Sequence, residues 1–122
     1  AIAFEIRKSW RVQPEILIVE PDAAPCLKES IENSKIITVA GSVSDMGRLD
    51  CKTPSLLAFE ILSDAANDFC LINEDQAKNA VRLAGEMGLK TSPSGAAGLA
   101  ALLANSDKDA SSLVFFTEGS VN

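Results

Sequence analysis

The sequence contains no histidine and no tyrosine. Histidine is the commonest general base and metal ligand among side chains, and tyrosine is a frequent proton donor. Acid–base chemistry by this chain alone would therefore depend on carboxylates, lysine or cysteine. No stretch approaches the roughly 20 apolar residues of a membrane helix, and the first residues lack the basic-then-apolar order of a signal peptide. We expect a cytoplasmic protein that has no membrane partner.

Positive charge and cysteine are also scarce. Eleven Lys and Arg residues stand against 17 Asp and Glu residues, which gives a net charge of −6. Without a dense basic stripe, most of the surface would repel a phosphate backbone, so nucleic acid is not an expected partner. Cys26, Cys51 and Cys70 are widely spaced and contain no CxxC pair. This spacing predicts reduced thiols and no metal site.

Apolar residues, by contrast, are plentiful enough to form a core. The chain has 122 residues, of which 47% are hydrophobic and 23% are charged, and this composition fits one α/β segment over residues 1–122. We expect strands at 16–19, 36–39, 68–72 and 113–116, and helices at 1–10, 23–33, 53–62, 73–88 and 94–103. The strands are continuously apolar and alternate with helices. This order predicts a mostly parallel sheet with helices on both faces.

Three local signals mark where helices begin and end. Thr53-Pro54 is a capping hydroxyl followed by proline at the first helical position. Asn73 and Gln76 have the spacing of a reciprocal capping box, and Gly88 is suited to end the helix that they begin. Residues 42–52 have no periodicity and are expected to form a loop.

The run Ser94-Gly95-Ala96-Ala97-Gly98 is the most informative part of the chain. Its small residues would let a helix lie close against a sheet, and Ser94 can cap the first turn. We therefore expect a tightly packed helix whose positive N-terminus points towards a partner group. An unliganded N-cap would explain the same serine equally well.

Several further motifs occur in order around this run. They are Val19-Glu20-Pro21, Cys26-Leu27, the loop from Met46 to Pro54, Glu60-Ile61-Leu62 and Thr117-Glu118-Gly119. In this order and spacing the motifs resemble the C-terminal half of fold-type II pyridoxal-phosphate (PLP) enzymes, which have a tryptophan synthase β-like fold. The family includes threonine and serine dehydratases, and the resemblance is greatest to its diaminopropionate ammonia-lyase branch.

The resemblance implies an enzyme that removes ammonia from a small amino acid by α,β-elimination. Such enzymes hold PLP as a Schiff base on a lysine and bind its phosphate in a glycine-rich loop. No lysine of this sequence lies in the family's lysine motif, so the resemblance places both features before Ala1. We expect the chain to be the C-terminal portion of a larger, homodimeric enzyme. Alone it is expected to be inactive and not to bind PLP.

The resemblance also assigns candidate site residues. Thr117 lies where the last predicted strand meets a turn and is the candidate contact for the pyridine nitrogen, while Ser94 and Gly95 are expected to line the cofactor pocket. The residues expected to border the substrate are Met46, Gly47, Leu49 and Cys51. The alternatives are that Thr117 only ends a strand and that residues 46–51 form an ordinary surface loop.

The sequence departs from the family pattern at two positions. Some relatives carry the polar residue one position before Thr117, where this chain has Phe116, and Pro93 replaces a glutamate of the ammonia-lyase pattern. Two other interpretations therefore stay open. One is a free-standing Rossmann-like domain that binds a small molecule or an anion at the helix beginning near Ser94. The other is a structural segment that self-associates through an unpaired sheet edge.

Overall fold

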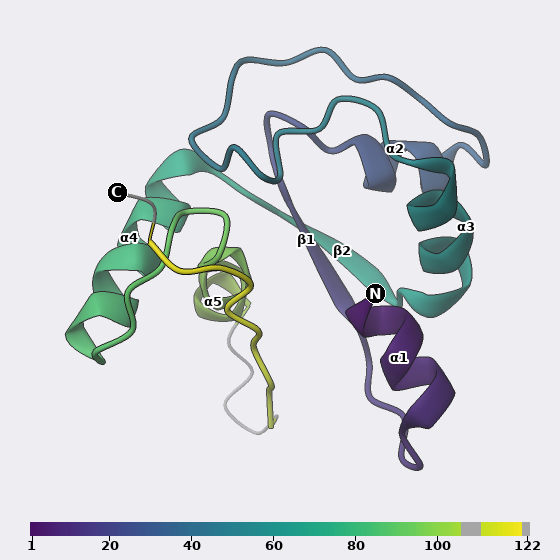
Figure 1. The fold of residues 1–122 in the computed structure, drawn as a ribbon. Coiled ribbons are helices and arrows are strands. Elements are labelled where there is room, and N and C mark those ends of the chain that lie inside the picture. Colours follow the sequence, from purple (N-terminus) through teal and green to yellow (C-terminus); the bar gives the residue numbers. More distant parts are fainter. Residues whose placement is uncertain (106–110, 121–122) are drawn as a thin grey trace.

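The computed structural model describes residues 1–105 and 111–120, and its centre is a pair of parallel strands (Figure 1). Strand β1 (Leu17–Pro21) pairs with β2 (Asp68–Ile72), so that Leu17 lies opposite Asp68 and Pro21 opposite Ile72. Both segments are mainly apolar, as the strands of parallel sheets are, and each ends in a fully buried residue, Pro21 or Ile72. The predicted strand 68–72 is confirmed in both bounds, and the strand predicted at 16–19 is displaced by one or two residues.

Helices lie on both sides of the two strands (Figure 1). On one side are α1 (Ile2–Ser9), α2 (Cys26–Glu32) and α3 (Leu56–Ala65), and on the other are α4 (Glu74–Glu86) and α5 (Ala97–Ala104). The predicted α/β class with parallel strands is therefore confirmed. None of the helices in the described ranges combines the length and the apolar character needed to cross a membrane.

Two predicted strands do not form in the described part of the chain. Residues 36–39 belong to the loop between α2 and α3, where Ile37 N–H donates to Ser30 Oγ at 2.8 Å and Val39 N–H to the Lys52 carbonyl at 2.9 Å. Residues 113–116 also join no sheet, and near them Thr91 and Gly119 form one isolated antiparallel bridge. In both places an apolar run lacks a neighbouring strand with which to form a ladder.

The helix signals have mixed outcomes. The capping box of α4 is confirmed, with Asn73 and Gln76 bonded reciprocally at 2.8 Å, and Gly88 follows that helix with a φ of 82°. The start predicted at Thr53-Pro54 is wrong, because Ser55 is the N-cap of α3 and accepts the Ala58 N–H at 3.1 Å. The Thr53 hydroxyl instead bonds to the Thr38 hydroxyl at 2.7 Å.

The core lies where α4 and α5 pack together beside the strands. Its fully or nearly fully buried members are Met46, Ile72, Ala77, Ala80, Ala96, Ala97, Ala100 and Ala101. Alanine and glycine let the helix backbones approach closely, and a Cβ on Gly98 would lie 3.0 Å from Val114 Cγ1. The tightly packed helix predicted from the small-residue run is therefore present as α5.

Candidate functional site

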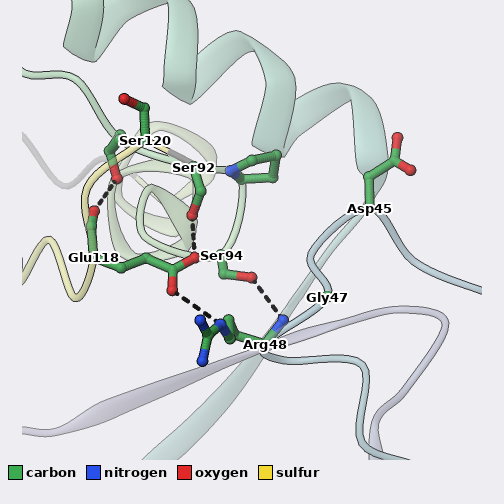
Figure 2. A pocket seen from close by; sticks show the side chains of 9 residues that line it. Asp45, Gly47, Arg48, Ser92, Ser94, Glu118 and Ser120 are labelled. Atoms are coloured by element: carbon green, nitrogen blue, oxygen red, sulfur yellow. Dashed lines mark hydrogen bonds and ion pairs between the residues drawn. The ribbon is translucent and has the colours of Figure 1, made fainter. Parts of the chain in front are cut away.

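Three segments that are distant in sequence meet at a hollow of about 470 Å³ beside the first turn before α5 (Figure 2). The loop after α2 contributes Asp45, Gly47 and Arg48, the turn before α5 contributes Thr91, Ser92, Pro93 and Ser94, and the C-terminal segment contributes Glu118 and Ser120. In Figure 1 the loop crosses the carboxyl ends of both strands. Ligands of open α/β sheets collect at that edge.

The loop is held in place at the N-terminus of α4. Ser44 Oγ donates to one Glu74 carboxylate oxygen, and the Asp45 N–H donates to the other at 3.1 Å. The next residue, Met46, is fully buried in the core. The two hydrogen bonds to Glu74 and the burial of Met46 fix the backbone on both sides of Asp45. Gly47 and Arg48 therefore lie at the hollow.

Ser94 is buried and connects the loop to the turn. Its Oγ accepts the Arg48 backbone N–H at 3.1 Å (Figure 2). The expectation that Ser94 caps α5 is wrong: the N-cap is Ala96, which makes no side-chain cap bond. The turn residue that bonds forward is Ser92, whose Oγ accepts the Gly95 N–H at 3.0 Å. A tight turn over residues 93–96 precedes the helix, which moves its first residue to position 97.

Glu118 fixes the C-terminal segment against this turn. Its carbonyl accepts a hydrogen bond from Thr91 Oγ1 at 2.7 Å, and its carboxylate accepts one from Ser92 Oγ. The other carboxylate oxygen lies 3.5 Å from Arg48 Nε. Gly95 allows this contact, since a Cβ there would lie 2.2 Å from Thr91 Oγ1 and 2.7 Å from the Glu118 carbonyl oxygen.

The other loop charges are paired as well. Lys78 Nζ lies 3.4 Å from Asp45, and Lys52 Nζ lies 2.6 Å from Asp50. The hydrogen bond from Lys52 lowers the pKa of the Asp50 carboxyl, and the Ser44 N–H adds to the effect. Among the described residues, no group of histidine, cysteine and acidic side chains has the arrangement of a metal site.

The structure brings only part of the predicted site together. Gly47 and Ser94 line the hollow, and Gly95 lies directly beneath it. Thr117 precedes Glu118 but is exposed and is not a lining residue. The remaining candidates lie elsewhere: Met46 is in the core, Leu49 packs against the core, and Cys51 is exposed on the loop. Their roles toward a cofactor or a substrate stay predictions.

The sequence reasoning missed the charged and hydroxyl residues that hold the hollow together. These are Arg48, Ser92, Glu118 and Ser120. Glu118 could have been identified from the sequence, because it is the middle residue of the Thr117-Glu118-Gly119 motif. Arg48 carried a signal too, since it is the only charged residue between Met46 and Leu49.

Comparison with known proteins decides the family. The profile of the family described as pyridoxal-phosphate dependent enzyme matches residues 1–118. The chain belongs to this family. The predicted resemblance to fold-type II PLP enzymes is thereby confirmed, and the family uses PLP as its cofactor.

Individual members of the PLP-dependent family agree with this assignment. Diaminopropionate ammonia-lyase of Escherichia coli (strain K12) is 32% identical over 123 aligned positions, which cover 84% of this chain and 31% of the relative. The T.th. threonine deaminase superposes with a TM-score of 0.69 at 26% identity, over 74% of this chain and 33% of that one. Maize serine racemase gives 0.70 at 28% identity, over 80% and 30%. The chain thus spans about a third of the length of each relative.

Proposed function

We propose that the chain forms one wall of the cofactor cleft of a PLP-dependent ammonia-lyase, which removes ammonia from a small amino acid by α,β-elimination. The observation that carries this proposal is the 32% identity to diaminopropionate ammonia-lyase across 84% of the chain. The similarity to threonine deaminase supports a lyase of this class. The chain spans about a third of these relatives, and we propose that the complete enzyme is longer. We also propose that it is homodimeric and cytoplasmic.

The chemistry of the hollow fits a neutral contact to PLP. Ser94 Oγ is buried, and it accepts the Arg48 N–H, so the hydroxyl proton of Ser94 keeps no acceptor among the described residues. A hydroxyl donor suits an unprotonated pyridine nitrogen, whereas a carboxylate would favour its protonated form. The Glu118 carboxylate is already bonded to Ser92 and paired with Arg48. Ser94 is therefore the buried hydroxyl of the hollow that still has a donor to offer, whereas the Ser120 hydroxyl is exposed.

When bound, PLP supplies the electron-withdrawing group that allows bonds at the substrate α-carbon to break. We propose that Ser94 and Thr117 donate hydrogen bonds to it and that Gly95 keeps the turn close enough for them to do so. Gly47 borders the substrate, while Met46 and Leu49 hold the loop from the core and Cys51 lies at its far end. The residues lining the hollow include no lysine, so we assign the amine that binds PLP to another part of the complete enzyme.

The test uses the complete polypeptide encoded by the gene. After incubation with PLP and dialysis, we expect a visible absorbance band from lysine-bound cofactor. With serine, threonine and 2,3-diaminopropionate, we expect ammonia and a keto acid from at least one of the three. Serine and threonine would give one ammonia for each keto acid, and 2,3-diaminopropionate, which has two amino groups, would give two. The polypeptide of residues 1–122 alone should retain no band. Loss of the cofactor on dialysis of the complete polypeptide, or no ammonia from any of the three amino acids, would refute the proposal.

A further inference from the structure

Arg48 is the charged group at the hollow whose bonding capacity is least used. Its side chain is 78% exposed, compared with 22% for Glu118. Its backbone is fixed by the bond from its N–H to Ser94, and its Nε faces Glu118 at 3.5 Å. Within the described ranges its two terminal nitrogens make no hydrogen bond, and the ion-pair partner of the side chain is Glu118. A fixed backbone thus presents a guanidinium fork at the rim of the hollow (Figure 2).

Of the two acidic residues of the hollow, Glu118 is the more fully engaged. Both carboxylate oxygens of Glu118 have partners, one in Ser92 and the other in Arg48. Asp45 is 65% exposed and lies 3.4 Å from Lys78 on α4. The other Asp45 oxygen has no partner among the described residues, but in Figure 2 the Asp45 side chain points away from Arg48. Arg48 retains two nitrogens with four N–H donors. A planar guanidinium with free donors is the side chain that best matches a carboxylate.

From this arrangement we infer that Arg48 binds a carboxylate of the amino-acid substrate and disfavours a substrate with a second ammonium group. The inference rests on the proposed function for the identity of the substrate, but the binding of a carboxylate is measurable without turnover. Glu118 has an opposing effect on the same ligand. Its negative charge lies beside the guanidinium and repels an incoming carboxylate, although it also orients Arg48.

The first experiment measures binding of malonate, a small dicarboxylate, to the PLP-loaded complete polypeptide by calorimetry. In Arg48→Ala we expect the dissociation constant to rise by about tenfold, as expected for loss of a charge-assisted fork. Arg48→Lys should recover only part of the affinity, because an ammonium has no fork. The matched control is Arg82→Ala, which removes another exposed arginine paired with an acid, Glu86, outside the hollow and should leave the affinity unchanged.

Glu118→Gln separates direct binding from simple positioning. If Arg48 binds the carboxylate itself, this variant should bind malonate about two to three times more tightly, because a neighbouring negative charge is gone. If Glu118→Gln and Arg48→Ala weaken binding equally, Arg48 acts only through Glu118 and the inference is wrong. An unchanged affinity in Arg48→Ala, with native circular dichroism and cofactor absorbance, would also overturn it.

Two further arms identify the ligand and separate the two proposals. Titration with inorganic phosphate tests the class of anion, because a guanidinium pairs with phosphate as well as with a carboxylate. Phosphate binding that depends on Arg48, together with malonate binding that does not, would exclude a substrate carboxylate. Ammonia release should show a rise in KM for serine in Arg48→Ala, with a smaller rise or a fall for 2,3-diaminopropionate. If malonate binds through Arg48 and no amino acid releases ammonia, the proposed function fails alone. Turnover combined with malonate binding that is independent of Arg48 would defeat this inference alone.

Discussion

The carboxylate of Glu20 at the end of β1 accepts the backbone N–H of Lys28 in the first turn of α2 at 2.8 Å. The second oxygen accepts the Leu27 N–H at 3.0 Å. Helix α2 has no side-chain cap of its own, and Pro25 occupies its N-cap position. A buried acid from the preceding strand thus satisfies two backbone donors that a serine or aspartate cap would satisfy in other helices.

Glu20 should make stability depend on pH in an unusual direction. Burial raises the pKa of Glu20 above its ordinary value, although the N–H groups of Leu27 and Lys28 oppose that rise. The folded state then holds this proton more tightly than the unfolded state, so the contribution of Glu20 is complete below the ordinary carboxyl pKa and decreases as pH rises through the raised value. As pH rises from about 4.5 to 7, the urea midpoint of the wild-type complete polypeptide should therefore fall relative to that of the Glu20→Gln variant. A difference that is constant over this range would contradict the raised pKa.

The thiol of Cys26, next to Glu20, should resist alkylation. Burial raises the pKa of the Cys26 thiol to about 11, and the negative charge of Glu20 adds to the effect. At pH 8 only on the order of a thousandth of such a thiol is ionised. In a mass-spectrometric time course with iodoacetamide, the exposed Cys51 should be labelled well before Cys26. Equal labelling rates in the native protein would show that Cys26 is accessible, and Cys51→Ser provides the control for peptide assignment.

Arg7 joins α1 to the end of α3 through several hydrogen bonds. Its guanidinium donates twice to the Ala65 carbonyl, at 2.9 and 3.1 Å, and once to Asn67 Oδ1 at 2.7 Å. Arg7→Ala should lower the free energy of unfolding by about 2 kcal/mol, because it leaves these acceptors without their charged donor. Arg11→Ala, a change at an exposed arginine four residues away, should alter it by less than about 0.5 kcal/mol. Urea denaturation distinguishes the two, and equal effects would mean that the Arg7 bonds contribute little.

Local signals in the sequence were sufficient to predict those features that depend on residues close together along the chain. The capping box of α4 is one example, because Asn73 and Gln76 satisfy each other's backbone within a single turn. The strand at 68–72 was also predictable, since its apolar run finds β1 as a partner. Residues 113–116 have a similar apolar run but no strand beside them in the described part of the chain. Apolar character therefore predicts an extended segment, whereas a strand also requires a partner.

In the candidate site too, residues within a short motif could be predicted, whereas contacts between distant segments could not. Gly47 and Ser94 could be chosen from motifs, because each lies within a short characteristic run. The contact between Arg48 and Glu118 could not, since it depends on how the loop after α2 and the C-terminal segment are placed by the core. The wrong assignment of Ser94 as a helix cap has a related cause. Ser92 supplies the bond within the turn, which leaves Ser94 to bond across to the loop.

Asn73 provides a clean test of the one cap that the sequence predicted correctly. Asn73→Ala removes the acceptor for the Gln76 N–H and should destabilise the protein by about 1 kcal/mol. Asn73→Ser keeps a side-chain oxygen at the N-cap and should lose no more than a few tenths of a kcal/mol. The two urea midpoints should therefore fall in that order. If serine and alanine have the same effect, the side-chain oxygen does not stabilise α4.

Glycine-to-alanine substitutions should distinguish the positions at which the structure has no room for a Cβ from those at which it has. In Gly95→Ala the new Cβ would lie 2.2 Å from Thr91 Oγ1 and 2.7 Å from the Glu118 backbone, and backbone atoms cannot rotate away as a side chain can. We expect a loss of at least about 2 kcal/mol, because Glu118 must move away from Ser92 to make room. Gly85→Ala, at a helix position with nothing within 4 Å, should instead stabilise by about 0.5–1 kcal/mol. Gly47→Ala also has open space around it and should leave the urea midpoint unchanged. A Gly95→Ala protein as stable as wild type would mean that the turn before α5 does not pack against Glu118, and the hollow would then lack the contact that shapes it.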